Sequence, residues 1–72
     1  MKMIKVVSSN VVAVGYKENN LYINYKSGSY IYYDVPQEIY AGLLAADSKG
    51  KYMWAKVKGR YDYSRLDKEG VY

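Results

Sequence analysis

The strongest structural signal in this chain lies in residues 11–34, which read VVAVGYKENNLYINYKSGSYIYYD. Within it, three short segments rich in Val, Ile and Tyr alternate between apolar and polar side chains: residues 11–17, 21–26 and 29–34. Such alternation is typical of β-strands with one buried face, and the Glu, Asn, Ser and Gly residues between the segments favour turns. The pattern predicts a three-stranded antiparallel meander.

The register of these strands follows from their two connections. A two-residue turn at residues 27–28 would place Tyr25 opposite Tyr30, and a connection at residues 17–20 would place Val12 opposite Tyr25. Both registers select the same apolar face, and agreement between two independent connections indicates a well-specified sheet. The predicted apolar face consists of Val12, Val14, Tyr16, Leu21, Ile23, Tyr25, Tyr30 and Tyr32.

Two helices are expected after this sheet. Pro36 suits the first turn of a helix, and the apolar side chains between residues 39 and 44 form one stripe that should cover the sheet. Ser48 would cap a second helix over residues 49–58 that stops at Gly59.

A further strand is expected at the end of the chain, because residues 60–65 alternate again, and residues 3–7 could pair with it. The chain is therefore expected to adopt an α+β fold. Its antiparallel sheet of three to five strands would carry two helices packed on one face.

Composition excludes several kinds of site. The 72-residue chain contains no Cys and no His, which removes disulfides, thiolate ligands and imidazole bases. No acids are paired at metal-ligand spacing, no Gly-rich loop could cradle phosphates, and Ser8-Ser9 lack a convincing base. We therefore expect no catalytic residue, no metal and no cofactor, and hence a protein that is not an enzyme.

Length and hydropathy also bear on partners. No stretch approaches the roughly 18–20 apolar residues of a membrane span, and the first residues lack the apolar region of a signal peptide. We therefore expect a cytoplasmic protein without a membrane partner. A single small core without disulfides or metals favours self-association as a source of stability.

Surplus positive charge is concentrated in the last third of the chain. Residues 49–72 hold seven Lys or Arg against three acids, whereas residues 1–48 hold four of each kind. Cations interleaved with aromatic rings suit a ligand with phosphates and flat bases. The alternative is a solvated helix face whose lysines favour the negative helix end. The candidate phosphate-binding residues are Lys49, Lys51, Lys56, Lys58, Arg60 and Arg65.

Five aromatic residues are candidates for stacking on a ligand or for a protein interface: Trp54, Tyr61, Tyr63, Tyr22 and Tyr33. Trp54 lies outside the inward stripe of the second helix, and an exposed Trp usually marks an interface. Tyr22 and Tyr33 would lie on the sheet face opposite the helices, where a cross-strand pair or a dimer contact are the alternatives to stacking. Tyr30 and Tyr32 are expected in the core, because they share the apolar face.

Several motifs also occur in a distinctive order. They are Val14-Gly-Tyr16, Tyr30-x-Tyr32-x-x-Val35-Pro36, Ala46-x-Ser48-x-Gly50-x-Tyr52-Met53 and Arg60-Tyr61-x-Tyr63. This order resembles the KTSC domain family, and the resemblance covers roughly Ile4 to Arg65. The family takes its name from the C-terminus of some lysyl-tRNA synthetases and also occurs as free-standing bacterial and phage proteins. Residues 1–66 would then be one KTSC-like domain, followed by a loose tail at 67–72.

The resemblance implies no known reaction, but its link to tRNA synthetases suggests RNA binding. The leading hypothesis is a small noncatalytic module that binds RNA or another phosphate-bearing nucleotide ligand through the basic second helix and last strand. The alternative is a protein-interaction or homo-oligomeric module, such as a phage-borne protein that binds a host factor. The half-apolar second face of the sheet motivates this alternative.

Overall fold

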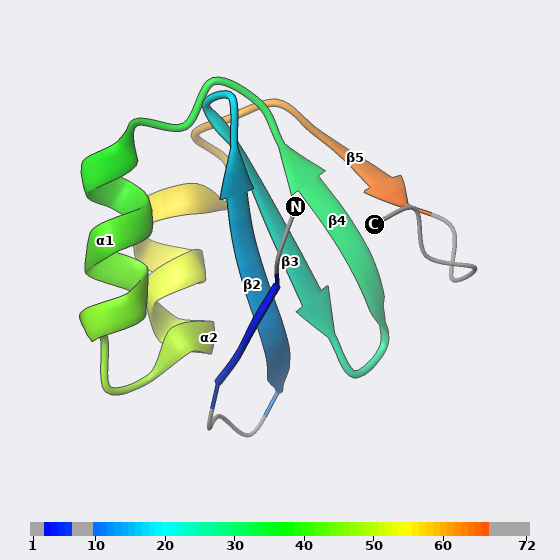
Figure 1. The fold of residues 1–72 in the computed structure, drawn as a ribbon, viewed down its shortest axis with the longest axis vertical. Coiled ribbons are helices and arrows are strands. Elements are labelled where there is room, and N and C mark those ends of the chain that lie inside the picture. The colour runs from blue at the N-terminus through cyan, green and yellow to red at the C-terminus, as the bar shows by residue number, and fades with distance from the viewer. Residues whose placement is uncertain (1–2, 7–9, 67–72) are drawn as a thin grey trace.

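The computed structural model describes residues 3–6 and 10–66 and contains one antiparallel sheet with helices on one side (Figure 1). The loose tail expected at residues 67–72 lies outside the described residues. Five strands follow one another in the sheet in the order of the chain. They are β1 (Ile4–Lys5), β2 (Val11–Lys17), β3 (Asn20–Tyr25), β4 (Gly28–Tyr32) and β5 (Tyr63–Leu66).

The helical segment between β4 and β5 consists of two rods. The first is α1 (Gln37–Ala45), and the second begins as α2 (Lys49–Tyr52) and continues as the π-helical turn η1 (Met53–Val57). Figure 1 shows both rods on the same side of the sheet, with β5 at the far edge. The predicted α+β fold is therefore confirmed. In the part of the chain that the structure describes, no helix is long and apolar enough to span a bilayer.

The β2–β3 turn fixes the first hairpin as the sequence predicts. Val14 pairs with Ile23 and Tyr16 with Leu21. The two turn residues, Glu18 and Asn19, both have positive φ angles, of 53° and 67°. Such angles at both central positions are characteristic of the type I′ turn, whose twist matches that of the two strands.

A β-bulge changes the far end of this hairpin. The register shifts between Val11 and Ala13, so that Val11 rather than Val12 pairs with Tyr25. Val11 is accordingly buried at 1% exposure, whereas Val12 is 42% exposed. The predicted core position of Val12 was therefore wrong, because the extra residue of a bulge interrupts strict alternation.

The β3–β4 hairpin is displaced by two residues from the predicted register. Tyr25 pairs with Gly28 and Ile23 with Tyr30, so the turn residues are 26 and 27. The predicted pairing of Tyr25 with Tyr30 was wrong. A shift of two residues preserves which face each side chain occupies, so Tyr30 still shares the helix-covered face.

The strand expected near the N-terminus has a different partner from the predicted one. β1 pairs with β2, and β5 pairs with β4. The first and last strands therefore lie at opposite edges of the sheet, and the expected pairing between them was wrong.

The core lies between the sheet and the helices. Its fully buried members come from β2, β3, the loop after β4 and both helical rods: Val11, Val14, Leu21, Ile23, Val35, Leu43, Met53 and Val57. The tyrosines Tyr16 and Tyr40 close one side of it, with their rings stacked at a centroid distance of 5.1 Å. The predicted stripe on the first helix is narrower than expected, because Leu44 is 37% exposed.

The two helical rods meet at a tight contact between Gly42 and Tyr52. The Tyr52 hydroxyl donates to the Ile39 carbonyl at 3.0 Å. A Cβ atom placed on Gly42 would overlap this hydroxyl and lie 3.0 Å from the ring carbon that carries it. Gly42 is therefore needed for close approach of the rods.

Gly42→Ala should destabilise the domain, although replacing Gly by Ala inside a helix normally stabilises it by up to about 1 kcal/mol. We expect a loss of about 1–3 kcal/mol from overpacking, measured by urea denaturation. Gly50→Ala is the matched control, because its Cβ would meet only an Asn10 atom at 4.0 Å. Tyr52→Phe should relieve part of the Gly42→Ala cost. A Gly42→Ala variant more stable than the parent would contradict this packing.

Stability should decline at alkaline pH. Burial raises the pKa of Tyr25, Tyr32 and Tyr40 above the usual tyrosine value. This stabilisation is complete below the unfolded pKa of about 10 and is lost as the pH rises toward the folded pKa values. The free energy of unfolding, measured in urea at several pH values, should fall above about pH 10. The fall should be shallower in Tyr25→Phe, and an unchanged slope in that variant would refute the assignment.

Candidate ligand groove

A groove runs between the β3–β4 hairpin and the second helical rod. It consists of two hollows, of about 480 and 330 Å³. The two hollows adjoin each other, because Tyr25, Tyr30, Trp54 and Lys58 line both of them. Volumes of this size fall within the roughly 300–1,000 Å³ typical of small-molecule sites.

The smaller hollow, here called the tyrosine end, is lined mainly by aromatic rings. Tyr32 and Tyr63 are added there to the shared residues. The Tyr63 ring lies 5.4 Å from the Tyr32 ring and 5.9 Å from the Tyr30 ring, and Tyr63 is 58% exposed. These tyrosines share one sheet face because paired residues of neighbouring strands point the same way. Figure 1 shows that the helices lie beside β2 and β3, which leaves β5 uncovered.

The larger hollow, here called the lysine end, brings three lysines from separate elements together. Lys26 comes from the hairpin turn, Lys51 from α2, and Lys58 from the residue after η1. Ser48 lies at the same end, where its hydroxyl caps α2 by accepting from the Lys51 N–H at 3.3 Å. No Asp or Glu of the described residues lines either hollow. The groove is therefore positively charged.

A π-helical turn positions Trp54 and Lys58 at the junction of the two ends. The Lys58 N–H donates to the Met53 carbonyl at 2.7 Å, which closes a turn five residues apart. The Lys58 ammonium lies over the Trp54 ring at 4.9 Å and over the Tyr25 ring at 5.3 Å. Cation–π attraction holds it there, and π-turns are frequent at functional sites.

Of the six predicted cations, only Lys51 and Lys58 line the groove. Lys49 donates to the Leu44 and Ala46 carbonyls at 3.0 and 2.6 Å, and Arg60 donates to the Ala55 carbonyl at 3.1 Å. These two side chains satisfy carbonyls near helix ends and so have structural roles. Lys56 is exposed and points elsewhere, because it lines neither hollow.

Arg65 supports the hairpin from the neighbouring strand. Its guanidinium lies over the Tyr30 ring at 5.9 Å and donates to the Ser27 carbonyl at 3.2 Å. Gly28 gives this side chain room, because a Cβ there would lie 3.0 Å from the guanidinium. Arg65 therefore stacks on a tyrosine of the neighbouring strand and has a structural role.

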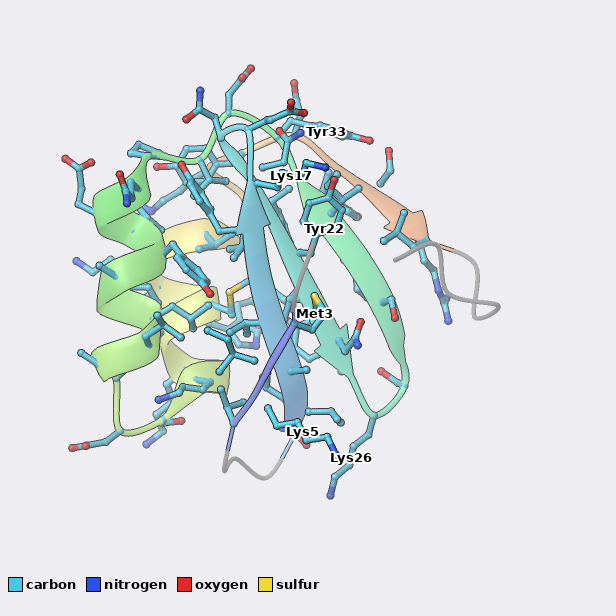
Figure 2. The ribbon with its side chains drawn as sticks, viewed as in Figure 1. Met3, Lys5, Lys17, Tyr22, Lys26 and Tyr33 are labelled. Atoms are coloured by element: carbon cyan, nitrogen blue, oxygen red, sulfur yellow. The ribbon has the colours of Figure 1, made fainter. Side chains whose placement is uncertain are left out.

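The predicted aromatic candidates divide between two faces. Trp54, at 72% exposure, and Tyr63 line the groove, whereas Tyr61 packs against the core. Figure 2 shows Lys26 at the hairpin and Tyr22 and Tyr33 near the other end of the sheet. Tyr33 donates to the Ser64 hydroxyl at 3.1 Å on the face away from the helices.

Sequence reasoning missed several residues of the groove. The sequence pattern places Lys26 at the end of a strand, whereas in the structure it forms part of the turn. Tyr25 and Tyr30 were assigned to the core, yet they are half-buried and line both hollows, while Tyr32 is buried at 3% exposure. The available signal was the two-residue spacing of Tyr30 and Tyr32, which places both on one face of the strand.

The Tyr25 hydroxyl is a further polar feature of this region. Among the described residues, it is a buried side-chain oxygen without a hydrogen-bond partner of acceptable geometry. Burial raises the pKa of this hydroxyl, and the nearby Tyr32 raises it further, so Tyr25 stays protonated at neutral pH.

The described residues hold no cluster of three His, Cys, Asp or Glu that could bind a metal ion. The groove thus offers rings and ammonium groups to a ligand.

Comparison with known proteins places the chain in a family. A protein of Tsukamurella paurometabola is 40% identical over 62 residues, which cover 82% of this chain and 92% of the relative. The crystal structure of a KTSC domain protein from Yersinia pestis has a TM-score of 0.87 and 28% identity, and the match covers 92% of this chain and 97% of that one. The model of the KTSC domain matches residues 7–61, and this chain therefore belongs to the KTSC domain family.

Proposed function

We propose that this domain is a noncatalytic module that binds RNA or another phosphate-bearing nucleotide ligand, and that the groove is its binding site. One observation carries the proposal: aromatic rings and three lysines line two adjoining hollows, and no acid of the described residues lines either of them. Rings with interspersed cations are the usual means of binding single-stranded nucleic acid without strict sequence preference.

The exposed rings would supply much of the affinity. Trp54 and Tyr63 keep 72% and 58% of their surface exposed, so a base could cover them without disturbing the core. Stacking of one base on an aromatic side chain contributes about 1–3 kcal/mol. The protein therefore gains from a flat ligand without reorganising its sheet.

The lysines would supply charge neutralisation, and their number limits how strongly salt weakens binding. Each phosphate contact on a single strand contributes a slope of about −0.7 to log affinity against log salt. If each of the three lysines neutralised a separate phosphate, the slope would be about −2, which is a roughly 20-fold loss between 50 and 200 mM salt, whereas one shared phosphate would give about −0.7. All six predicted cations on separate phosphates would have doubled the slope of about −2.

Fluorescence anisotropy with labelled single-stranded RNA, repeated across a salt series, tests the proposal. Lys51→Ala and Lys58→Ala should each weaken binding and make the salt slope shallower by about 0.7. Lys56→Ala is the matched control, because it removes the same charge from the same rod outside the groove. Binding that is undetectable at low salt, or that is equally sensitive to Lys56→Ala, would exclude the groove as a nucleic-acid site.

Self-association is a second candidate function. Ile4 and Val12, on the paired strands β1 and β2, remain 46% and 42% exposed, so a second copy of the chain could cover them. Light scattering over a concentration series should then give a mass above the 8.3 kDa of one chain. A mass that stays at the monomer value, together with no protein captured from a lysate, would remove this candidate.

A further inference from the structure

The two ends of the groove differ in chemistry. The lysine end presents ammonium and hydroxyl groups, whereas the tyrosine end presents mostly ring faces and edges. Because both ends share Trp54 and Lys58, one ligand can occupy them together. Such a ligand must carry an anionic group at one end and a flat, largely apolar ring at the other.

The number of available cations limits the length of this ligand. Lys49 and Arg60 are held by backbone carbonyls, and Arg65 is held by Ser27 and Tyr30. Among the described residues that line the groove, the cations are Lys26, Lys51 and Lys58. Three ammonium groups around one hollow match one phosphate group, whereas an extended strand needs a row of cations along its backbone.

We propose that the groove holds a single nucleotide unit, with its phosphate at the lysine end and its base at the tyrosine end. This inference rests on the proposed function and specifies its ligand. A free nucleotide and the terminal nucleotide of an RNA chain offer the same chemistry, a base joined through a sugar to a phosphate. The orientation is set by the charge of the two ends, since Lys58 is the one cation of residues 3–6 and 10–66 that lines the tyrosine end.

Lys58 links the two ends. Its ammonium lies over the Trp54 and Tyr25 rings. A base that stacks on Trp54 displaces this ammonium, and a phosphate at the lysine end offers it a partner of opposite charge. The phosphate gives Lys58 a new partner in place of the cation–π contacts that the base removes. A base and a phosphate joined in one ligand should therefore bind more tightly than their separate affinities indicate.

Trp54 is the only Trp of the chain, so its fluorescence reports occupation of the groove directly. Titrations would use a nucleoside, its 5′-monophosphate, its 3′-monophosphate, inorganic phosphate and RNA oligonucleotides of increasing length. We expect a monophosphate to bind at least about tenfold more tightly than the nucleoside, as charge-assisted hydrogen bonds require. Oligonucleotides should bind about as tightly as the better monophosphate, with no further gain with length.

Variants separate the two ends. Lys51→Ala should weaken the monophosphate by roughly fivefold or more and leave the nucleoside unchanged. Tyr63→Ala should weaken both ligands by at least about fivefold, because it removes a stacking ring. Lys58→Met should reduce the advantage of the monophosphate over the nucleoside. Lys56→Ala and Tyr33→Ala are the controls, because neither residue lines the groove, and each should bind like the parent.

The outcomes distinguish this inference from the function on which it rests. If long RNA binds with affinity that rises steadily with length, while monophosphates do not bind, the module binds RNA but the single-nucleotide site is wrong. Equal losses of nucleoside and monophosphate in Lys51→Ala would also refute the division into two ends. If neither RNA nor any nucleotide binds, both proposals fail. Urea denaturation of each variant shows whether a loss of binding reflects a loss of folding.

Discussion

The backbone of Val35 holds the sheet and the helices in their relative positions. Its N–H donates to the Asn19 carbonyl at 2.7 Å, and its own carbonyl accepts from the Tyr16 hydroxyl at 2.5 Å. Its side chain is fully buried, and the ring of Tyr16 stacks on Tyr40 of α1. A buried polar group that loses its partner costs about 1–3 kcal/mol, so α1 cannot move without breaking these contacts. The second helical rod, which forms one wall of the groove, follows α1 in the chain and depends on the same anchor.

Much of the fold follows from local chemistry and could be predicted. Alternation with a period of two defined the strands, and Ser48 capped the second rod as expected. Two features of the sheet could not be predicted in this way. The bulge beside Val12 adds a residue to one strand, and the turn at residues 26–27 is set by backbone angles that several sequences can adopt. Both depend on tertiary contacts, and both alter which side chains meet across the strands.

The sequence predicted the kind of groups at the candidate site, cations beside aromatic rings, but not which residues would supply them. The density of charge in residues 49–60 indicates the rod that lines the groove, yet a sequence does not show that Lys49 and Arg60 donate to backbone carbonyls. The sequence likewise does not show which tyrosines of the sheet line the groove and which lie in the core. Tyr30 lies on the helix-covered face, as alternation requires, but the helices do not extend far enough to bury it. A side chain on that face is buried in the core where the helices cover it, and lines the groove where they do not.

The π-turn at residues 53–57 has a consequence for how the length of this chain can vary. A π-turn is equivalent to an α-helix with one inserted residue, so deleting a residue there would restore ordinary helix geometry. A deletion between Trp54 and Lys58 would also shorten their spacing from four residues to three and change how the Lys58 ammonium lies over the Trp54 ring. Relatives that retain the groove should therefore keep this spacing, while gaps and insertions fall in the loops on either side.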